Sequence, residues 1–154
     1  MNEVIIHKAE QLDGSELTRL VEESTGEGFR HLQRLIRDYE SGTNTFDKQG
    51  EALFLAYYQG ALAGVCGLNQ DPYALDQPVG RVRRMYVSTG SRRLGIGRRL
   101  MEAVIAEARC HYSMLVLRTD NPEADRFYRS LGFKPDETAD HNSHYLPLEA
   151  CGLG

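Results

Sequence analysis

Two periodicities of apolar and polar residues alternate along this chain, and they predict its strands and helices. Short apolar runs typical of strands occupy residues 3–9, 51–58, 61–68, 81–88, 113–119 and 144–149. Apolar residues at helical spacing predict helices near residues 13–21 and 29–39, after Gly97, and over 121–132. The polar stretches 41–50 and 69–80 lack either period and are expected to be loops.

Turn and capping residues fall at the predicted boundaries. Asp13 and Glu16 fit the N-cap and third position of the first helix. Gln59-Gly60 joins two strand-like runs and indicates a hairpin. Pro122 suits the first turn of the last helix, which Gly132 would end. Pro147 cannot donate a ladder hydrogen bond, so the final strand is expected at a sheet edge.

The strand–helix–strand unit at 81–119 sets the expected architecture. Such a unit forms a right-handed parallel crossover, whereas the hairpin makes neighbouring strands antiparallel. The sequence therefore predicts an α/β (α+β) fold with a mixed, mostly antiparallel central sheet and helices on both faces. With 154 residues, of which 41% are hydrophobic, the chain is long enough for one core, and we expect a single domain over 3–150.

Charge, apolar runs, cysteines and histidines make several classes of function less favoured. The net charge of -4 weighs against a nucleic-acid partner, because such binding depends on phosphate neutralisation. We see neither a signal-peptide pattern at the start nor an apolar run of membrane-spanning length, so a cytoplasmic protein without a membrane partner is expected. Cys66, Cys110 and Cys151 form no disulfide framework, and His141 and His144 have no further ligands at metal spacing. No metal is expected.

The stretch RRMYVSTGSRRLGIGRRL, residues 83–100, carries the first chemical signal. Gly95 and Gly97 stand where a helix begins, and the free backbone N–H groups of such a turn favour a phosphate. A P-loop is excluded because no Gly-Lys-Ser/Thr follows, and a dinucleotide fingerprint is excluded because Leu100 occupies the third glycine position. From the glycines alone, a tight turn with solvated arginines remains an equal alternative.

Two motifs together resemble the GNAT superfamily of N-acetyltransferases. Residues 92–97, RRLGIG, resemble the family's Arg/Gln-x-x-Gly-x-Gly/Ala motif. Residues 121–133 resemble its second signature, Asn-x-x-Ala-x-x-Phe-Tyr-x-x-x-Gly-Phe, at Asn121, Ala124, Phe127, Tyr128, Gly132 and Phe133. The predicted strand and helix order also fits the family fold, so the resemblance covers nearly the whole chain.

The resemblance implies a binding site for acetyl-CoA as cosubstrate. Backbone groups of residues 85–87 would pair with the pantetheine arm, and the N–H groups of 93–98 would hold the pyrophosphate. Asn121 would bond the arm, and Tyr128 would stand near the thioester sulfur. The cofactor-binding residues expected on this basis are Met85, Tyr86, Val87, Arg92, Arg93, Leu94, Gly95, Ile96, Gly97, Arg98, Asn121, Ala124, Phe127 and Tyr128.

Acetyl transfer to an amine gives Tyr128 a specific role. A leaving thiolate needs a proton, and a tyrosine with a pKa of about 10 is protonated at pH 7, so Tyr128 can act as general acid. A strand N–H near Val87 could stabilise the oxyanion. The alternative for the Phe127-Tyr128 pair is core packing, which we expect for Phe127, since adjacent helical residues point about 100° apart.

The base is not identified by the sequence. An amine of pKa about 10.4 is neutral in roughly one molecule in a thousand at pH 7, so a base or a water chain is useful. Some members of the family carry a glutamate on the central strand, but the matching position here is about Arg81. Candidates elsewhere are Glu23, Glu27, Asp71 and His144. The arginines 81, 83 and 84 could be solvated edge residues, ion-pair partners or binders of an acceptor carboxylate.

These observations predict an acetyl-CoA-dependent N-acetyltransferase. A small-molecule or peptide primary amine would attack directly in a ternary complex, because nothing marks Cys66 or Cys110 as an activated nucleophile. Segments 22–50 and 69–80 would shape the acceptor pocket, and a homodimer is possible because family members are often dimers. The alternatives are a non-catalytic acyl-CoA-binding sensor or interaction module, suggested by the missing carboxylate, and a nucleic-acid module using the arginine run 81–99.

Overall fold

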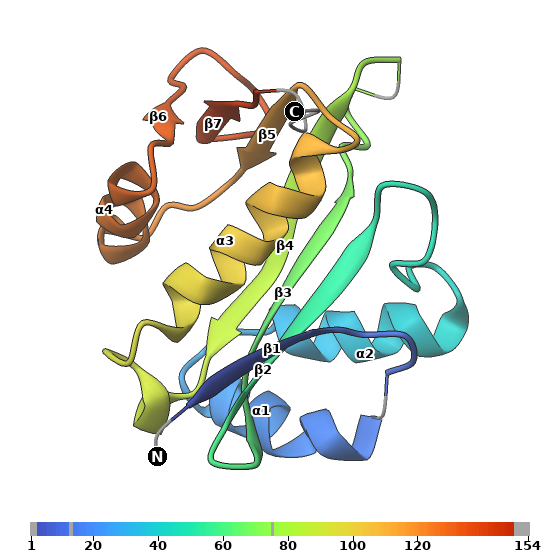
Figure 1. Ribbon diagram of the computed structural model, residues 1–154, viewed down its shortest axis with the longest axis vertical. Helices are drawn as coiled ribbons and strands as arrows, with labels where there is room; N and C mark the ends of the chain where they lie inside the picture. Colours follow the sequence, from blue (N-terminus) through green and yellow to red (C-terminus); the bar gives the residue numbers. More distant parts are fainter. Residues whose placement is uncertain (1–2, 13, 75, 150–154) are drawn as a thin grey trace.

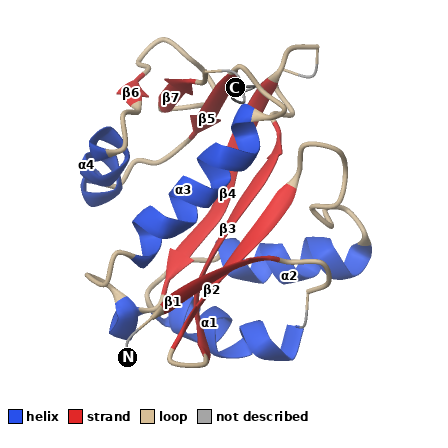
Figure 2. Ribbon diagram, viewed as in Figure 1, coloured by secondary structure: helices blue, strands red, loops and turns tan. Residues whose placement is uncertain are grey.

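A seven-stranded sheet organises the computed structural model, which describes residues 3–12, 14–74 and 76–149 (Figures 1 and 2). The helices are α1 (Gly14–Gly26), α2 (His31–Ser41), α3 (Ile96–Arg109) and α4 (Pro122–Ser130), with a short 3₁₀ turn η1 (Thr89–Ser91) before α3. The strands are β1 (Val4–Lys8), β2 (Ala52–Tyr58), β3 (Ala61–Gln70), β4 (Val79–Val87), β5 (Met114–Leu117), β6 (Lys134–Pro135) and β7 (His144–Pro147).

The strand order is β1-β2-β3-β4-β5-β7-β6. Within the described ranges, β4 and β5 are the one parallel pair, and α3 connects them. The other neighbouring strands are antiparallel. The predicted mixed, mostly antiparallel sheet with a parallel crossover is therefore confirmed.

Helices cover both faces of the sheet, as predicted. Leu100, Met101 and Val104 of α3 are fully buried against one face, where α4 also packs. Leu17 and Leu20 of α1 are fully buried against the other face, beside α2. Figure 2 shows α3 crossing in front of the strands, with α1 and α2 behind them. The helical stripes in the sequence are thus the buried faces.

Two boundaries differ from the sequence prediction, and a third lies outside the described residues. Helix α2 begins at His31, so Phe29 lies ahead of it and its side chain is 39% exposed. Strands β3 and β4 extend into the predicted loop 69–80, because Asn69 pairs with Arg81 and the Asp71 N–H donates to the Val79 carbonyl at 2.9 Å. Asp13, the predicted N-cap, is not among the described residues.

The prediction that the final strand lies at a sheet edge is wrong. Strand β7 lies between β5 and β6, and the two-residue β6 forms the edge. Strand β6 pairs only with His144 and Tyr145, so Pro147 stands beyond that ladder and its missing N–H removes no hydrogen bond there. No helix in the described part of the chain is long and apolar enough to cross a membrane.

Candidate active site

Strands β4 and β5 separate after three residue pairs, and a cleft opens where they part. Strand β5 pairs with Val79–Arg81 at the start of β4 and then diverges from β4 while it stays paired with β7, and the chain continues to α4 (Figure 1). The rest of β4, up to Val87, has no strand on that side among the described residues. The cleft has a volume of about 1220 Å³, and its walls come from β4, the start of α3, the end of β5 and α4. A free strand edge therefore borders the cleft.

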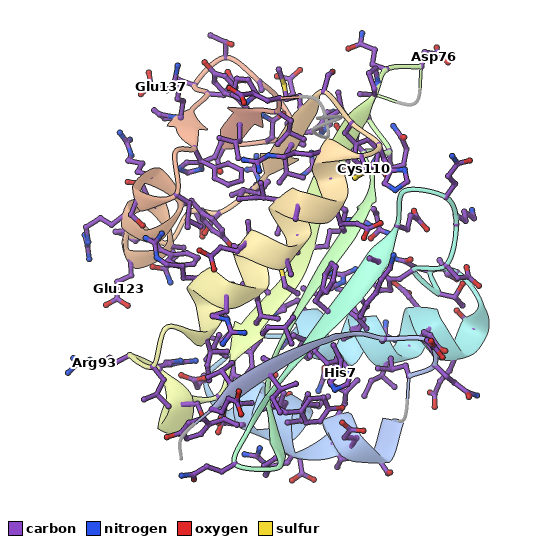
Figure 3. The ribbon with its side chains drawn as sticks, in the orientation of Figure 1. His7, Asp76, Arg93, Cys110, Glu123 and Glu137 are labelled. Atoms are coloured by element: carbon purple, nitrogen blue, oxygen red, sulfur yellow. The ribbon has the colours of Figure 1, made fainter. Side chains whose placement is uncertain are left out.

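The turn between β4 and α3 forms one end of the cleft. Arg93 and Gly95 both have positive φ, of 73° and 77°, and Gly95 is the N-cap of α3. No side chain caps this helix end in the structure. Its first N–H groups are therefore available to an anion, which the helix dipole also favours. Figure 3 shows the Arg93 side chain extending outward from this turn.

Glycine occurs at the two positions of this turn for different reasons. Gly95 needs the left-handed conformation, which other residues adopt at a cost of about 1 kcal/mol or more. Gly97 has no such need, and a Cβ there would meet Phe127 Cζ at 3.4 Å and Met85 Cε at 3.5 Å, which are ordinary contacts. Nothing in the protein itself therefore requires glycine at 97, whereas a ligand approaching the backbone would.

A β-bulge interrupts β4 beside the cleft. The register with β3 shifts between the pairs Val65–Tyr86 and Gly67–Arg83, and Arg84 has a φ of 60°. The Met85 carbonyl accepts a hydrogen bond from His31 Nε2 at 3.0 Å. This bond fixes the tautomer of the neutral ring, which leaves Nδ1 as an acceptor. Burial, ahead of the charge of Arg84, holds the pKa of His31 below its usual value, while the bond to Met85 opposes this shift.

His31 lines the cleft, although no sequence motif selects it. It is half-buried at the first position of α2, with the rings of Phe29 and Tyr86 at 5.9 and 6.2 Å. In sequence it is one polar position within the predicted helix 29–39, which is too common a feature to be informative. Only the packing of α2 against β4 brings the ring to the bulge.

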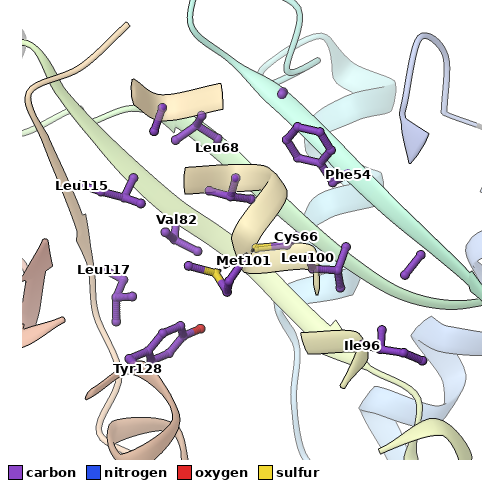
Figure 4. Packing of buried hydrophobic residues seen from close by; sticks show 14 of the residues in the cluster. Phe54, Cys66, Leu68, Val82, Ile96, Leu100, Met101, Leu115, Leu117 and Tyr128 are labelled. Carbon is purple, nitrogen blue, oxygen red and sulfur yellow. Dashed lines mark hydrogen bonds between the residues drawn. The ribbon is translucent and has the colours of Figure 1, made fainter. Parts of the chain in front are cut away.

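Tyr128 lies on α4, which forms one wall of the cleft. Its side chain is 7% exposed and belongs to the core cluster that includes Phe133. Figure 4 shows it beside Leu117 of the same cluster. Its hydroxyl has no hydrogen-bond partner among the described residues, and because no fully buried side-chain oxygen there is unpartnered, the hydroxyl reaches the cleft that the residue lines. Burial raises the pKa of Tyr128, so the phenol is protonated at neutral pH. Phe127, expected in the core, is the more exposed of the pair and also lines the cleft.

Asn121 begins α4 and caps it. Its Oδ1 accepts from the N–H groups of Glu123 at 2.8 Å and Ala124 at 3.4 Å, with Pro122 at the first turn as predicted. Its Nδ2 makes no bond to a described residue. The capping bonds fix the side chain at the mouth of the cleft, which leaves the amide N–H group for a ligand.

A carboxylate network joins α1 to the end of β4. The Tyr86 hydroxyl contacts Glu23 Oε2 at 2.7 Å and Glu27 Oε1 at 2.5 Å, and the Arg92 guanidinium makes a bidentate pair with Glu27 at 2.9 and 3.0 Å. Glu23 also accepts from the Thr89 N–H at 3.1 Å. Arg92 is therefore an anchor of the turn, held by an acidic residue, and not a free cation.

None of the four base candidates from the sequence is a free base. Hydrogen bonds, from Arg92 first, hold the pKa of Glu27 below its usual value, and bonds from Tyr86 and its neighbours outweigh burial to lower the pKa of Glu23. Asp71 is 4% exposed and accepts from Arg81 Nε at 2.9 Å. His144 is also 4% exposed, contacts Asp125 at 2.6 Å and Ser143 at 2.7 Å, and does not line the cleft.

All but one of the predicted binding residues line the same cleft. Thirteen of the fourteen line it, namely Met85, Tyr86, Val87, Arg92, Arg93, Gly95, Ile96, Gly97, Arg98, Asn121, Ala124, Phe127 and Tyr128. Leu94 does not, and its side chain is 43% exposed. Two motifs about two dozen residues apart thus meet across one cleft.

The cysteines and histidines offer no other reactive centre in the part of the chain that is described. Cys66 is fully buried, and burial raises its pKa to about 12, so it is a neutral thiol. Cys110 lies at the far end of α3 from the turn (Figure 3). His141 stacks on Tyr73 at 3.7 Å, and no group of three metal-ligating side chains occurs in the searched ranges. Cys151 falls outside the described residues.

Comparison with known proteins identifies the family. Residues 15–133 match the model of the acetyltransferase (GNAT) family, and the chain belongs to this family. A putative acetyltransferase from Exiguobacterium sp. 255-15 is 31% identical, with a TM-score of 0.83 over 94% of this chain and 93% of that one. No curated protein matches the chain.

More distant structures share the fold. A GNAT-family acetyltransferase from Staphylococcus aureus Mu50 is 20% identical, with a TM-score of 0.75 over 96% of this chain and 100% of that one. One from Streptococcus pneumoniae is also 20% identical, with a TM-score of 0.74 over the same shares. The family uses acetyl-CoA as cosubstrate and acts on amine acceptors, so acetyl transfer is the general activity of the class to which this protein belongs.

Proposed function

We propose that this protein is an acetyl-CoA-dependent N-acetyltransferase whose acceptor is a primary amine. The observation that carries the proposal is the continuous cleft from the uncapped start of α3, along the free edge of β4, to the unpartnered hydroxyl of Tyr128. An anion site, an extended hydrogen-bonding edge and a proton donor follow one another in the order that a thioester of coenzyme A requires.

The chain supplies complementary groups for each part of the donor. The N–H groups of 93–98 would bind the pyrophosphate, as helix N-termini do. The free backbone edge of 85–87 would pair with the amides of the pantetheine arm, as a strand pairs with an edge. Asn121 would donate its amide N–H to the arm, while Ala124 and Phe127 form the wall beside it. Arg92 would act through Glu27, by holding the turn in place.

Tyr128 would act as the general acid. The amine nitrogen forms its bond to the thioester carbonyl carbon, the carbon–sulfur bond breaks, and Tyr128 gives its proton to the departing sulfur. Burial raises the pKa of Tyr128, so the phenol is in the protonated form that a proton donor needs at neutral pH. A backbone N–H near the bulge, at Val87, would stabilise the oxyanion. Direct attack is favoured over an acyl-cysteine because the thiol of Cys66 is neutral and buried.

His31 is the described group best suited to receive the proton of the amine. It lines the cleft, its ring is neutral at pH 7, and its tautomer leaves Nδ1 as an acceptor. The transfer would be direct or through one water. Of the four groups selected from the sequence, three carboxylates and one histidine, each either already accepts hydrogen bonds from neighbouring side chains or lies outside the cleft.

Turnover of an amine panel tests the proposal. The protein is incubated with acetyl-CoA and primary amines, released thiol is followed, and acetyl-CoA binding is measured separately by calorimetry. We expect thiol release that depends on the amine and yields the N-acetyl product by mass spectrometry. Binding of acetyl-CoA with no turnover of any amine would instead support the non-catalytic sensor.

A further inference from the structure

Strand β4 carries three arginines, Arg81, Arg83 and Arg84, and their partners differ. Arg81 and Asp71 form a buried ion pair at 2.9 Å, with side chains 7% and 6% exposed. Arg84 pairs with Asp38 of α2 at 3.5 Å. Arg83 is half-buried, lines the cleft and makes no hydrogen bond or ion pair with any residue of the described ranges. A partly desolvated guanidinium is unfavourable without a counter-charge, so this position fits an anionic ligand.

The strand register fixes the wall to which Arg83 belongs. Arg83 pairs with Gly67, whose position faces Phe46 on the side of the sheet that α1 and α2 cover. Val82, the preceding residue, packs on the opposite side with α3. Successive strand residues alternate between faces, so Arg83 projects toward the α2 side of the cleft. It is therefore on the same side of the sheet as the helix that carries His31.

This wall carries excess positive charge. Both Arg83 and Arg34 of α2 lie close enough to oppose the charge of Arg84, whose pKa is lowered first by burial and then by these neighbours. The negative charge of Asp38 acts in the opposite direction and raises the pKa of Arg84. On this side of the sheet, Arg83 and Arg84 line the cleft and Arg34 lies near Arg84 outside it, with Asp38 as the carboxylate that pairs with Arg84. The resulting field attracts an anion to this side of the cleft and disfavours an acceptor that carries only positive charge.

This charge lies close to the reacting end of the donor, an argument that rests on the proposed function. If the pantetheine arm follows 87 back to 85, its thioester reaches the bulge at Arg84 and Met85. Arg83 is two residues before Met85, or about 7 Å along the strand. A ligand that presents its amine to the thioester would therefore place a group a few bonds away beside Arg83.

We infer that the acceptor is an amine that also carries a carboxylate, and that Arg83 binds this carboxylate. The planar fork of arginine fits a carboxylate through two parallel N–H···O bonds. Arg81 cannot serve in this way because Asp71 occupies it, and Arg84 is held by Asp38. Arg83 is thus the specificity-determining residue of the acceptor site.

Matched amine pairs test the inference in the full chain. The series consists of amino acids of increasing chain length, their carboxamides, and aminoalkyl phosphates of the same lengths. We expect kcat/KM for the favoured amino acid to exceed that for its carboxamide by about 10- to 100-fold. This is the fold-change that corresponds to the free energy of a hydrogen bond to a charged group. Arg83→Gln should remove most of this ratio by lowering kcat/KM for the acid alone, and Arg83→Lys should retain part of it.

Arg34→Gln is the matched control. It removes one positive charge from the same wall, but Arg34 is exposed and does not line the cleft. We expect it to keep the preference for the acid. Calorimetric affinity for acetyl-CoA and the melting temperature should be unchanged in all three variants, because Arg83 has no described partner to lose.

Several results would overturn the inference. Equal or greater turnover of the carboxamides would do so, as would a preference for phosphates or an Arg83→Gln variant that keeps the wild-type ratio. If acetyl-CoA binds and no amine is acetylated, the proposed function fails. Calorimetric binding of the amino acids to the protein loaded with coenzyme A then decides the inference separately: no dependence on Arg83 contradicts it.

Discussion

Replacing Tyr128 with phenylalanine removes one oxygen atom, and the structure indicates what that atom does. The hydroxyl has no hydrogen-bond partner in the described part of the chain, so its loss leaves no unpaired group. No fully buried side-chain oxygen among the described residues lacks a partner, so this hydroxyl reaches the cleft, and its removal should leave the free energy of unfolding nearly unchanged. The ring remains, and with it the packing against Phe133 at a centroid distance of 5.6 Å.

The expected effect of Tyr128→Phe is on kcat. General acids contribute about 10²- to 10⁴-fold, and a thiolate of pKa about 8.5 is a fair leaving group, so we expect a loss near 10²-fold, or about 2.7 kcal/mol. Thiol release under saturating acetyl-CoA measures kcat, and calorimetry measures the affinity for acetyl-CoA, which should change little. A kcat within about threefold of wild type, or an affinity loss as large as the kcat loss, would refute the general-acid assignment.

Tyr112→Phe is the matched control for this variant. Tyr112 belongs to the same core cluster, but its hydroxyl donates to the Gly50 carbonyl at 2.8 Å and it does not line the cleft. The substitution leaves a buried carbonyl unpaired, which costs about 1–3 kcal/mol and lowers the melting temperature by a few degrees. We expect kcat to be retained. The two identical chemical changes should therefore separate activity from stability.

Three further predictions follow from the geometry. Gly95→Ala forces a side chain into a φ of 77°, so we expect about 1 kcal/mol less stability by chemical denaturation and weaker acetyl-CoA binding by calorimetry; unchanged binding would contradict the role of the turn. Cys66→Ala removes a neutral thiol that lies 3.8 Å from Met101 Sδ, so kcat should persist, and an acyl-enzyme detected by mass spectrometry would contradict direct attack. Because the pKa of His31 is lowered, its neutral form prevails at pH 7, and wild-type kcat/KM should fall only below about pH 6.5. His31→Gln keeps an N–H for the Met85 carbonyl but should lose this acid limb, and a persistent limb would exclude His31 as the base.

The arginine run 81–99 illustrates how structure changes the meaning of a motif. In sequence it resembles a basic patch suited to nucleic acid. In the structure Arg81, Arg84 and Arg92 each pair with a carboxylate from another element, at 2.9, 3.5 and 2.9 Å. Three of the seven arginines in the run are therefore neutralised within the protein, while Arg98 and Arg99 donate to neutral groups, the Ser130 hydroxyl and the Val4 carbonyl. Arg83 and Arg93 remain without described partners, one in the middle of the cleft and one at its phosphate end.

The sequence by itself determined the elements and the two motifs of the cleft. Strand and helix periods, the Gln59-Gly60 hairpin and the Asn121-Pro122 helix start depend on residues that are close in the chain, so local physics specifies them. The glycine turn that precedes α3 is of the same kind, and the structure adds that Gly95 is left-handed. These features were sufficient to predict the parallel crossover and the family.

Only the tertiary structure decided which charges are free and which side chains meet. Arg83 is available because Asp71 and Asp38, from a loop and a helix distant in sequence, pair with its two arginine neighbours. His31 enters the cleft because α2 packs against the bulge in β4. Partners of this kind depend on long-range packing of the sheet and its helices, and the spacing of residues along one chain does not encode which of several similar side chains will be paired.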